Sequence, residues 1–228
     1  AEGCRVSRCT VIGTLADAPL PGYGISLGSG SDVTGSNVRN CESGGIFLAS
    51  SRLSVRDCTV SANGPFGIGG PGAGFEIANG YYSEISGCHV SGHTAAPGYG
   101  IAVVGECSIN NNTLINNLEA GIASGGGGNR ITGNFGRGNG NNAGGFNFSG
   151  QIVLYGERNH VEDNTCTGGP RNGIVSFGRN VIVRNTCGNN PNANYIFNSG
   201  TDIIGPIINR VAAGGAITTS DPSANISY

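Results

Sequence analysis

The chain has 228 residues, of which 11% are charged, and its formal net charge is -2 at pH 7. So few charges argue against electrostatic nucleic-acid binding, which needs a basic stripe. No segment approaches the roughly 20 consecutive apolar residues of a membrane span. The 43 glycines by themselves would suggest disorder, but the regular spacing of aliphatic residues excludes it.

In chain order, the sequence repeats a unit of about 20–30 residues, the period of a solenoid. Apolar residues alternate with a period of two, and Gly or Asn follows every few residues, so each unit predicts short strands separated by turns. The central aliphatic residue of the successive units is Val6, Val33, Val55, Ile85, Ile109, Ile131, Val161, Ile182 and Ile204.

A small or amide side chain follows each aliphatic residue after three positions: Cys9, Ser36, Cys58, Cys88, Asn112, Asn134, Asn164 and Asn185. Equivalent residues of successive coils stack about 4.8 Å apart. Stacked Asn side chains hydrogen-bond along the axis. The column therefore predicts a ladder of asparagines that gives way to Cys and Ser toward the N-terminus.

Two further patterns accompany this column. Eight residues after the aliphatic position stand Thr14, Cys41, Asn63, His93, Asn117, Asn139, Gly169 and Asn190, a second ladder in which we expect His93 to be structural. A Gly-aliphatic pair closes most units: Gly24-Ile25, Gly45-Ile46, Gly100-Ile101, Gly121-Ile122 and Gly173-Ile174.

These I-x-x-N-x-h and G-I units resemble the right-handed parallel β-helix of the pectate-lyase-like superfamily, in particular its secreted repeat proteins, over roughly residues 4–210. The resemblance implies an all-β, single-stranded solenoid of about eight to nine rungs with Asn and Cys ladders. It divides the chain into a β-helix at 1–210 and a C-terminal extended tail at 211–228. The fold hosts lyases, hydrolases, adhesins and structural proteins, so it leaves the function open.

Eight cysteines favour an oxidising compartment, and the start Ala-Glu-Gly-Cys favours a mature secreted product. Cys58 and Cys88 share one column on neighbouring rungs, as do Cys166 and Cys187. The rung spacing of about 4.8 Å lies within the Cα range of a disulfide. The sequence predicts these two bridges, the alternative being thiols packed as small apolar side chains.

The sequence contains few residue groupings of the kind that catalyse reactions in this fold. Pectate lyases of this fold use clustered Asp for Ca²⁺, related lyases use a Lys/Arg pair, and this chain has scattered carboxylates and no Lys. The one grouping that suits acid–base catalysis is Arg56, Asp57, Glu76 and Glu84, with a solvated charge pair as the ordinary alternative. Asp163 shares a column with Arg184, which predicts a surface ion pair. No Cys-x₂-Cys pair or phosphate loop occurs, so we expect neither metal nor cofactor.

Insertions at 15–24, 64–74, 92–100 and 136–150 occupy the same stage of the rung and should project from one side. Their aromatic residues suit sugar stacking or packing onto the coil: Tyr23, Phe66, Tyr99, Phe146 and Phe148. Glycosylation sequons occur at Asn111, Asn147 and Asn225.

An open β-helix exposes strand edges at its ends, and no helical segment precedes the first unit in this sequence. We therefore predict a non-enzymatic extracellular structural protein whose copies stack head to tail into a fibre or surface appendage. The tail at 211–228 would cover its own last rung or pair with a neighbour. The alternative function is a polysaccharide lyase or hydrolase, or a polysaccharide-binding module.

Overall fold

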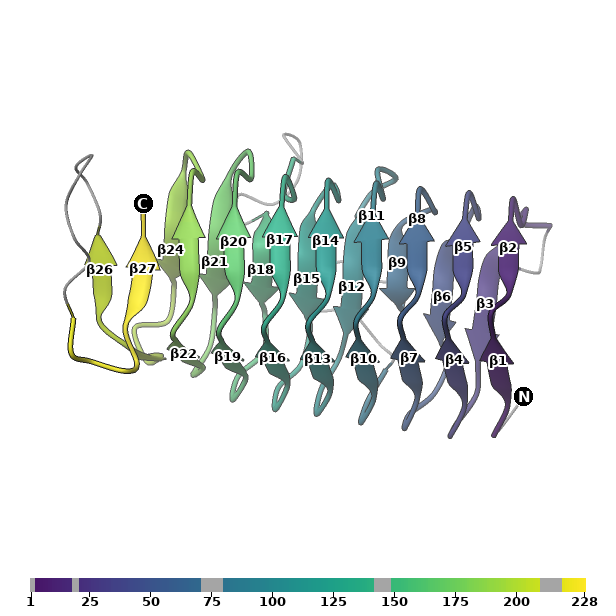
Figure 1. Cartoon of the computed structure of the whole chain (residues 1–228), viewed down its shortest axis with the longest axis horizontal. Coiled ribbons are helices and arrows are strands. Elements are labelled where there is room, and N and C mark those ends of the chain that lie inside the picture. The colour runs from purple at the N-terminus through teal and green to yellow at the C-terminus, as the bar shows by residue number, and fades with distance from the viewer. Residues whose placement is uncertain (1–2, 18–20, 71–79, 142–148, 210–218) are drawn as a thin grey trace.

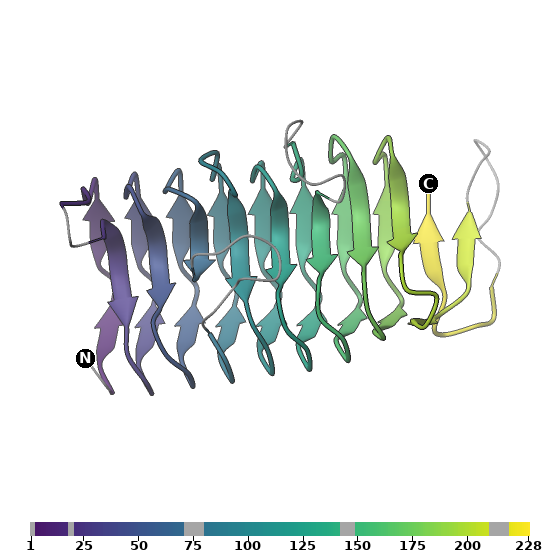
Figure 2. The ribbon, with the colours of Figure 1, turned by 180° about the vertical axis from the view of Figure 1, so that it is seen from behind.

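The computed structural model describes residues 3–17, 21–70, 80–141, 149–209 and 219–228, and over these ranges the chain is a rod of short strands with no helix (Figure 1). One strand from each of three parallel sheets makes up a rung, and successive rungs stack along the rod. The two termini lie at opposite ends, as both views show (Figure 2). The predicted parallel β-helix is confirmed.

The first sheet contains, in order, β1 (Arg5–Ser7), β4 (Asp32–Thr34), β7 (Ser54–Arg56), β10 (Glu84–Ser86), β13 (Ser108–Asn110), β16 (Arg130–Thr132), β19 (His160–Glu162), β22 (Val181–Val183) and β25 (Ile203–Ile204). The second contains β2 (Thr10–Ile12), β5 (Asn37–Arg39), β8 (Thr59–Ser61), β11 (His89–Ser91), β14 (Thr113–Ile115), β17 (Phe135–Arg137), β20 (Thr165–Thr167), β23 (Thr186–Gly188), β27 (Asn225–Ser227) and β26 (Ile207–Asn209). The third contains β3 (Tyr23–Leu27), β6 (Gly44–Leu48), β9 (Phe66–Gly69), β12 (Tyr99–Val103), β15 (Ala120–Ser124), β18 (Gly150–Leu154), β21 (Asn172–Ser176) and β24 (Ala193–Phe197).

The core is built on the predicted aliphatic column. In-register pairing stacks these residues in the first sheet, and the seven from Val33 to Ile182 are 0% exposed. Burial of each such side chain is worth about 1.5–3 kcal/mol. The column is therefore a principal source of stability along the rod.

The corner between the first and second sheets is a column of left-handed residues. One residue per rung has φ between 52° and 65°: Arg8, Gly35, Asp57, Gly87, Asn111, Gly133, Asp163 and Arg184. Gly, Asn and Asp tolerate this conformation best, which explains why the repeat supplies them there. Arg8 and Arg184 are exceptions whose side chains project outward at the corner.

The glycine of the Gly-Ile motif lies beside the second ladder in the third sheet. A Cβ added to Gly100 would lie 2.6 Å from the oxygen of Gly121 and 2.8 Å from Nδ2 of Asn117. The motif therefore exists because only glycine leaves room for the ladder amide. One such pair was not recognised in the sequence: Gly67-Ile68, within the expected insertion at 64–74, belongs to β9.

The first ladder joins each rung to the next. Oδ1 of Asn134 accepts the backbone N–H of Asn112 at 3.0 Å, and its Nδ2 donates to the oxygen of Ile109 at 2.9 Å. The same geometry recurs at Asn164 and Asn185. These amides satisfy backbone groups at the corner that strand pairing does not reach.

A third ladder, which the sequence analysis missed, fills the corner that precedes the first sheet. Oδ1 of Asn159 accepts the N–H of Asn129 at 3.0 Å, and Oδ1 of Asn180 accepts the N–H of Asn159 at 2.8 Å. Asp202 ends the column by accepting the N–H of Asn180 at 2.9 Å.

The C-terminal segment returns to its own rod. Strand β27 lies between β23 and β26, and Asn225 extends the first ladder by accepting the N–H of Asn185 at 2.9 Å. The tail thus pairs with strands of its own chain, and residues 211–218 of the expected tail at 211–228 lie outside the described residues. Asn225, one of the three sequon asparagines, is 0% exposed in the folded chain.

We expect Asn134→Ala to destabilise the rod by about 1–3 kcal/mol, because it leaves the N–H of Asn112 and the oxygen of Ile109 buried without partners. Asn141→Ala, at an exposed position, is the matched control and should change the unfolding free energy little. Equal effects in denaturant titrations of the two variants would contradict a stabilising role for the ladder.

His93 replaces an amide in the second ladder and is 0% exposed. Its Nδ1 accepts the N–H of Asn63 at 3.2 Å, and Nε2 lies 3.4 Å from the oxygen of Val60 and can donate to it. Gly67 makes room for the ring, since a Cβ there would lie 2.6 Å from Nε2. Burial lowers the pKa of His93 from 6.5 to about 4, so the imidazole is neutral in the folded chain.

The unfolded chain binds this proton near pH 6.5 and the folded chain only near pH 4, so stability falls as the pH drops through that window. A shift of this size corresponds to about 3 kcal/mol. We expect His93→Asn, which restores the ladder amide, to remove that part of the acid dependence while folding at neutral pH. Melting curves from pH 7 to 4 that run parallel for both proteins would refute the assignment.

Candidate functional site

Three of the four residues of the predicted acid–base grouping lie within the described residues. Arg56 ends β7, Asp57 occupies the following corner, and Glu84 begins β10 on the next rung, opposite Ser54 rather than Arg56. Within the described ranges no ion pair joins these three side chains, and Glu84 instead accepts a hydrogen bond from Ser86 at 3.4 Å. Glu76 lies outside the described residues.

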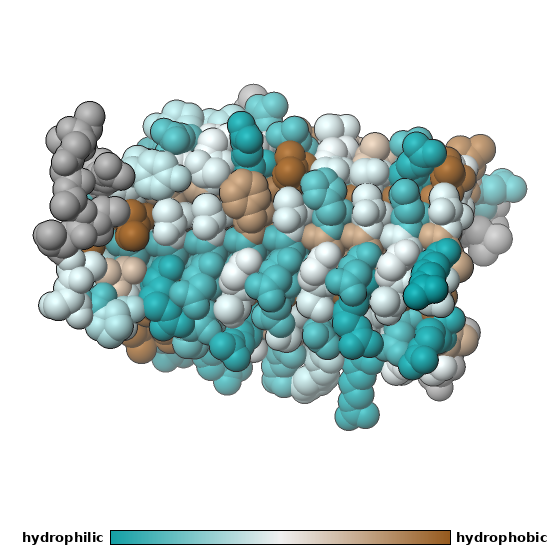
Figure 3. Space-filling model, in the orientation of Figure 1, coloured by the Kyte–Doolittle hydropathy of each residue, from teal (hydrophilic) through white to brown (hydrophobic). Residues whose placement is uncertain are grey.

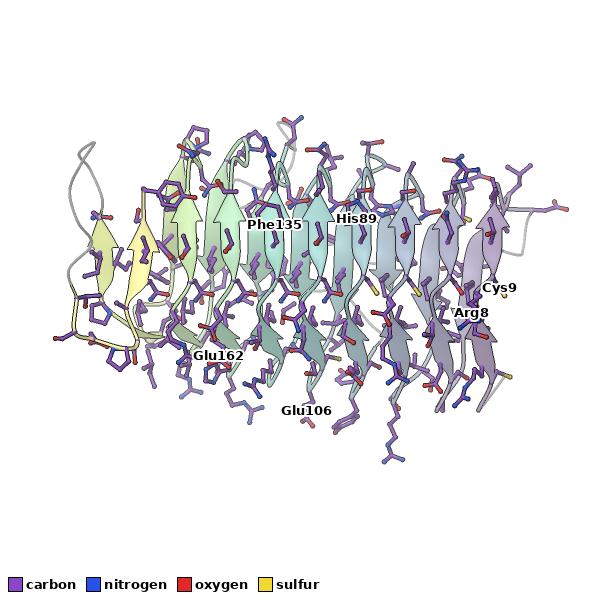
Figure 4. The ribbon with its side chains drawn as sticks, viewed as in Figure 1. Arg8, Cys9, His89, Glu106, Phe135 and Glu162 are labelled. Carbon is purple, nitrogen blue, oxygen red and sulfur yellow. The ribbon has the colours of Figure 1, made fainter. Side chains whose placement is uncertain are left out.

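Arg56 faces the other way, toward the N-terminal end of the rod. It shares a surface groove of about 470 Å³ with side chains from the first two rungs: Arg5, Ser7, Arg8, Thr34 and Gly35. Figure 4 labels Arg8 at the corner between β1 and β2. This basic groove was not expected from the sequence, because its arginines lie about 50 residues apart along the chain and meet only through the stacking of rungs.

The densest charged cluster surrounds Glu162 on the outer face of the first sheet (Figure 4). Its carboxylate, 8% exposed, lies 2.7 Å from Nη2 of Arg130, 2.6 Å from Nη2 of Arg184 and 3.3 Å from Nε2 of His160. Asp163 and Arg184 form the pair anticipated from their column, with contacts of 2.9 and 3.1 Å. Three successive rungs thus share one network.

The hydrogen bond from Arg130 holds the pKa of Glu162 below its usual range, against the opposing effect of burial, and His160 and Arg184 add to it. The hydrogen bond from Arg184 likewise lowers the pKa of Asp163. Both carboxylates are ionised at neutral pH and held by arginines, so neither serves as a proton donor. The network clamps rungs together.

The predicted disulfides are not present in the structure, in which all eight cysteines are free thiols. Cys166 pairs in register with Cys187, and Cys58 and Cys88 occupy neighbouring rungs as expected. The Cα spacing of about 4.8 Å suits a disulfide. In-register side chains point the same way, however, so their Cβ atoms keep that spacing, which exceeds the ~3.8 Å that a bridge prefers. A hydrogen bond from Cys88 lowers the pKa of Cys58 to about 7.

The aromatic residues of the insertions divide between core and surface. Phe66 and Tyr99 begin strands β9 and β12 and are 1% exposed, so they pack rather than form platforms. Tyr23 is half-buried and stacks on Phe47 with ring centroids 4.3 Å apart. Phe146, Phe148 and the sequon at Asn147 lie outside the described residues, whereas Asn111 is exposed at a corner.

One buried carboxylate escaped the sequence analysis. Glu119 is 1% exposed before β15, on the side of the third sheet that also buries Tyr99 and Tyr155. Burial, followed by the neighbouring Tyr99 and Glu119, raises the pKa of Tyr155. A lone Glu in a loop carries no sequence signal that would have revealed this burial.

Across the described residues, no group of three or more His, Cys, Asp or Glu side chains could hold a metal ion. The described part of the chain also has no helix long and apolar enough to cross a membrane. His89 points outward from the second sheet, in the column that also carries Phe135 (Figure 4).

The profile of the family described as right handed beta helix region matches residues 1–118, just over half of the chain. The in-register strands continue beyond the match without a break, because β13 pairs with β16 and β14 with β17 in the same registers. A comparison with curated proteins gave no match.

We expect Glu162→Gln to lower the unfolding free energy by about 1–2 kcal/mol, since it leaves Arg130 and Arg184 without their shared anion. A depressed carboxylate pKa stabilises the fold above the unfolded-state value and ceases to do so as the pH falls. The difference from wild type should therefore shrink below about pH 4.5.

Glu157→Gln is the control, because Glu157 pairs with Arg179 at 2.9 Å but is 50% exposed. It should have little effect, as surface pairs do. If thermal melts show the same loss for both variants at pH 7, burial of the Glu162 network contributes nothing.

Proposed function

The chain belongs to the right-handed β-helix family, and from this premise we propose that it is a non-enzymatic, extracellular structural rod that joins further copies end to end through its first rung. Where this contact repeats head to tail, it builds a fibre or surface appendage. The observation that carries the proposal is that, within the described residues, β1, β2 and β3 each pair with a strand on one side only.

Each of these strands occupies the terminal place in its sheet, and together they make one rung (Figure 1). An exposed parallel edge is a template for another strand. Ile12 and Leu15 are 52% and 77% exposed at this end, next to the exposed Cys9. The long face formed by the first and second sheets is mostly hydrophilic, with hydrophobic patches at this end, in the middle and toward the opposite end (Figure 3). Hydrophobic contact is thus available at the rung edge.

The opposite end differs in shape. Among the described residues the first, second and third sheets have nine, ten and eight strands, so the C-terminal end is stepped. Strand β27 pairs with β23, and Tyr195 donates a hydrogen bond to Asn185 at 2.8 Å, closing the core. While β26 and β27 remain docked, the three sheets end at different levels. The first rung of another copy, whose three strands lie at one level, can then pair with only one of these sheets. With the tail docked, contact between two first rungs is favoured, which closes a dimer. Head-to-tail growth of a fibre therefore requires release of the tail.

The second candidate, a polysaccharide-binding module, is favoured by the stacked Tyr23–Phe47 pair on the outer face of the third sheet. Both rings are half-buried, and sugars stack on such surfaces. Binding of oligosaccharides that is lost in Phe47→Ala, without any self-association, would favour this function over the structural one.

We expect Ile12→Lys to prevent association of the full chain, because a charge on an edge strand opposes strand pairing. Ile115→Lys is the matched control, since Ile115 occupies the same column in the middle of the second sheet. Light scattering and electron microscopy over a concentration series should show dimers or filaments for wild type and Ile115→Lys, and monomers for Ile12→Lys.

A wild-type protein that remains monomeric at every concentration, as it would if another segment covered β1–β3, would overturn the proposal. Identical behaviour of the two variants would do the same.

A further inference from the structure

We propose that the basic groove across the first three rungs is a binding site for a phosphate or sulfate group. Its volume of about 470 Å³ falls within the range of small-molecule sites. The inference concerns the side of the rod near its first rung, and it does not depend on the proposed self-association.

The floor of the groove is the outer face of the first sheet. In-register pairing places Ser7, Thr34 and Arg56 side by side on rungs one, two and three. Rungs one and three are therefore about 9.6 Å apart, twice the strand spacing. Two hydroxyl groups thus lie in the floor between cationic side chains that enter from either end.

Arg8 reaches along the rod from the first corner. The next residue of its column is Gly35, and a Cβ added there would lie 3.8 Å from Cγ of Arg8. The aliphatic part of Arg8 therefore lies over the second rung, in space that any larger residue at position 35 would share. Arg56 comes from the third rung, so the two guanidinium groups approach the same volume from opposite sides.

The nearby acids leave the groove positively charged. Arg5 lies 3.6 Å from Asp32, but in the described part of the chain neither Arg8 nor Arg56 forms an ion pair. Asp57 leans toward the fourth rung, since a Cβ at Gly87 would lie 2.5 Å from its Oδ1. Arg8 and Arg56 consequently repel each other until an anion lies between them.

The donor arrangement selects the class of anion. Guanidinium groups bind phosphate and similar oxyanions through paired N–H donors. Here donors come from the floor, through Ser7 and Thr34, and from both ends, through Arg8 and Arg56. Donors in several directions suit a tetrahedral oxyanion better than a planar carboxylate, whose oxygens lie in one plane.

The test is a titration of the full chain with inorganic phosphate, inorganic sulfate and acetate at constant ionic strength, followed by calorimetry and by the amide NMR signals of Thr34 and Gly35. We expect phosphate or sulfate to bind and to shift these signals, and the Arg8→Gln/Arg56→Gln variant to bind at least tenfold more weakly. Whichever of phosphate and sulfate binds more tightly identifies whether the natural ligand carries a phosphate or a sulfate group.

Arg137→Gln/Arg158→Gln removes the same charge from exposed arginines elsewhere and should bind as wild type does. Equal losses in the two double variants would mean a nonspecific charge effect and would overturn the site. Acetate binding as tight as phosphate would overturn the tetrahedral assignment, and the absence of any shift at Thr34 and Gly35 would overturn the location.

Discussion

The fold depends on the hydrogen bonds that side-chain amides make at its corners. Strand pairing satisfies the backbone only within the sheets, and each rung turns three times. At the corner after the first sheet, Asn134 and Asn164 each accept a backbone N–H and donate to a backbone oxygen of the preceding rung. An unpaired buried backbone group costs about 1–3 kcal/mol. By pairing the backbone groups buried at the corner, these amides remove that cost at each rung that has one.

The glycines beside the ladders and the ladder side chains occupy shared space, so each restricts which residue can stand at the other position. Gly100 leaves room for Asn117, and where the repeat carries Gly136 and Gly169 instead of larger side chains, Gln151 fills the space from the third sheet. Its Oε1 accepts a hydrogen bond from Asn139 at 2.6 Å, and a Cβ at Gly136 would lie 2.9 Å from that oxygen. A gap in one column is thus compensated by a residue from another strand.

Constant spacing along the chain decides which parts of the molecule could be predicted from the sequence. The aliphatic column and the first two ladders have constant spacing from one reference residue, so Asn112 or Asn117 could be assigned by counting. The third ladder also has constant spacing, because Asn129, Asn159 and Asn180 each stand two residues before the reference aliphatic residue, so counting backward as well as forward would have revealed it. Asn225 is 40 residues from its partner Asn185, and only the return of the tail brings them together.

The candidate sites were harder to predict because they depend on the direction in which each side chain points as well as on the register of the strands. Counting placed Asp163 beside Arg184, and their contact needs only the column. It did not reveal that Asp57 leans away from Arg56, or that Arg8 lies over Gly35. For the cysteines, the column gave the correct neighbours, and the parallel direction of their Cβ atoms set the outcome.

The ladders also give the rod an electrical direction. Nδ2 of each amide donates to Oδ1 on the next rung, from Asn112 to Asn134, Asn164 and Asn185, at 2.9–3.0 Å. The amide dipoles therefore align and polarise one another, as peptide dipoles do in an α-helix. The C-terminal half carries this alignment in the first and third columns, and the second column carries it only from Asn117 to Asn139. The N-terminal half, with Cys and Ser at many of the same corners, carries little of it. The C-terminal half of the rod thus contains rows of aligned amide dipoles, which the N-terminal half largely lacks.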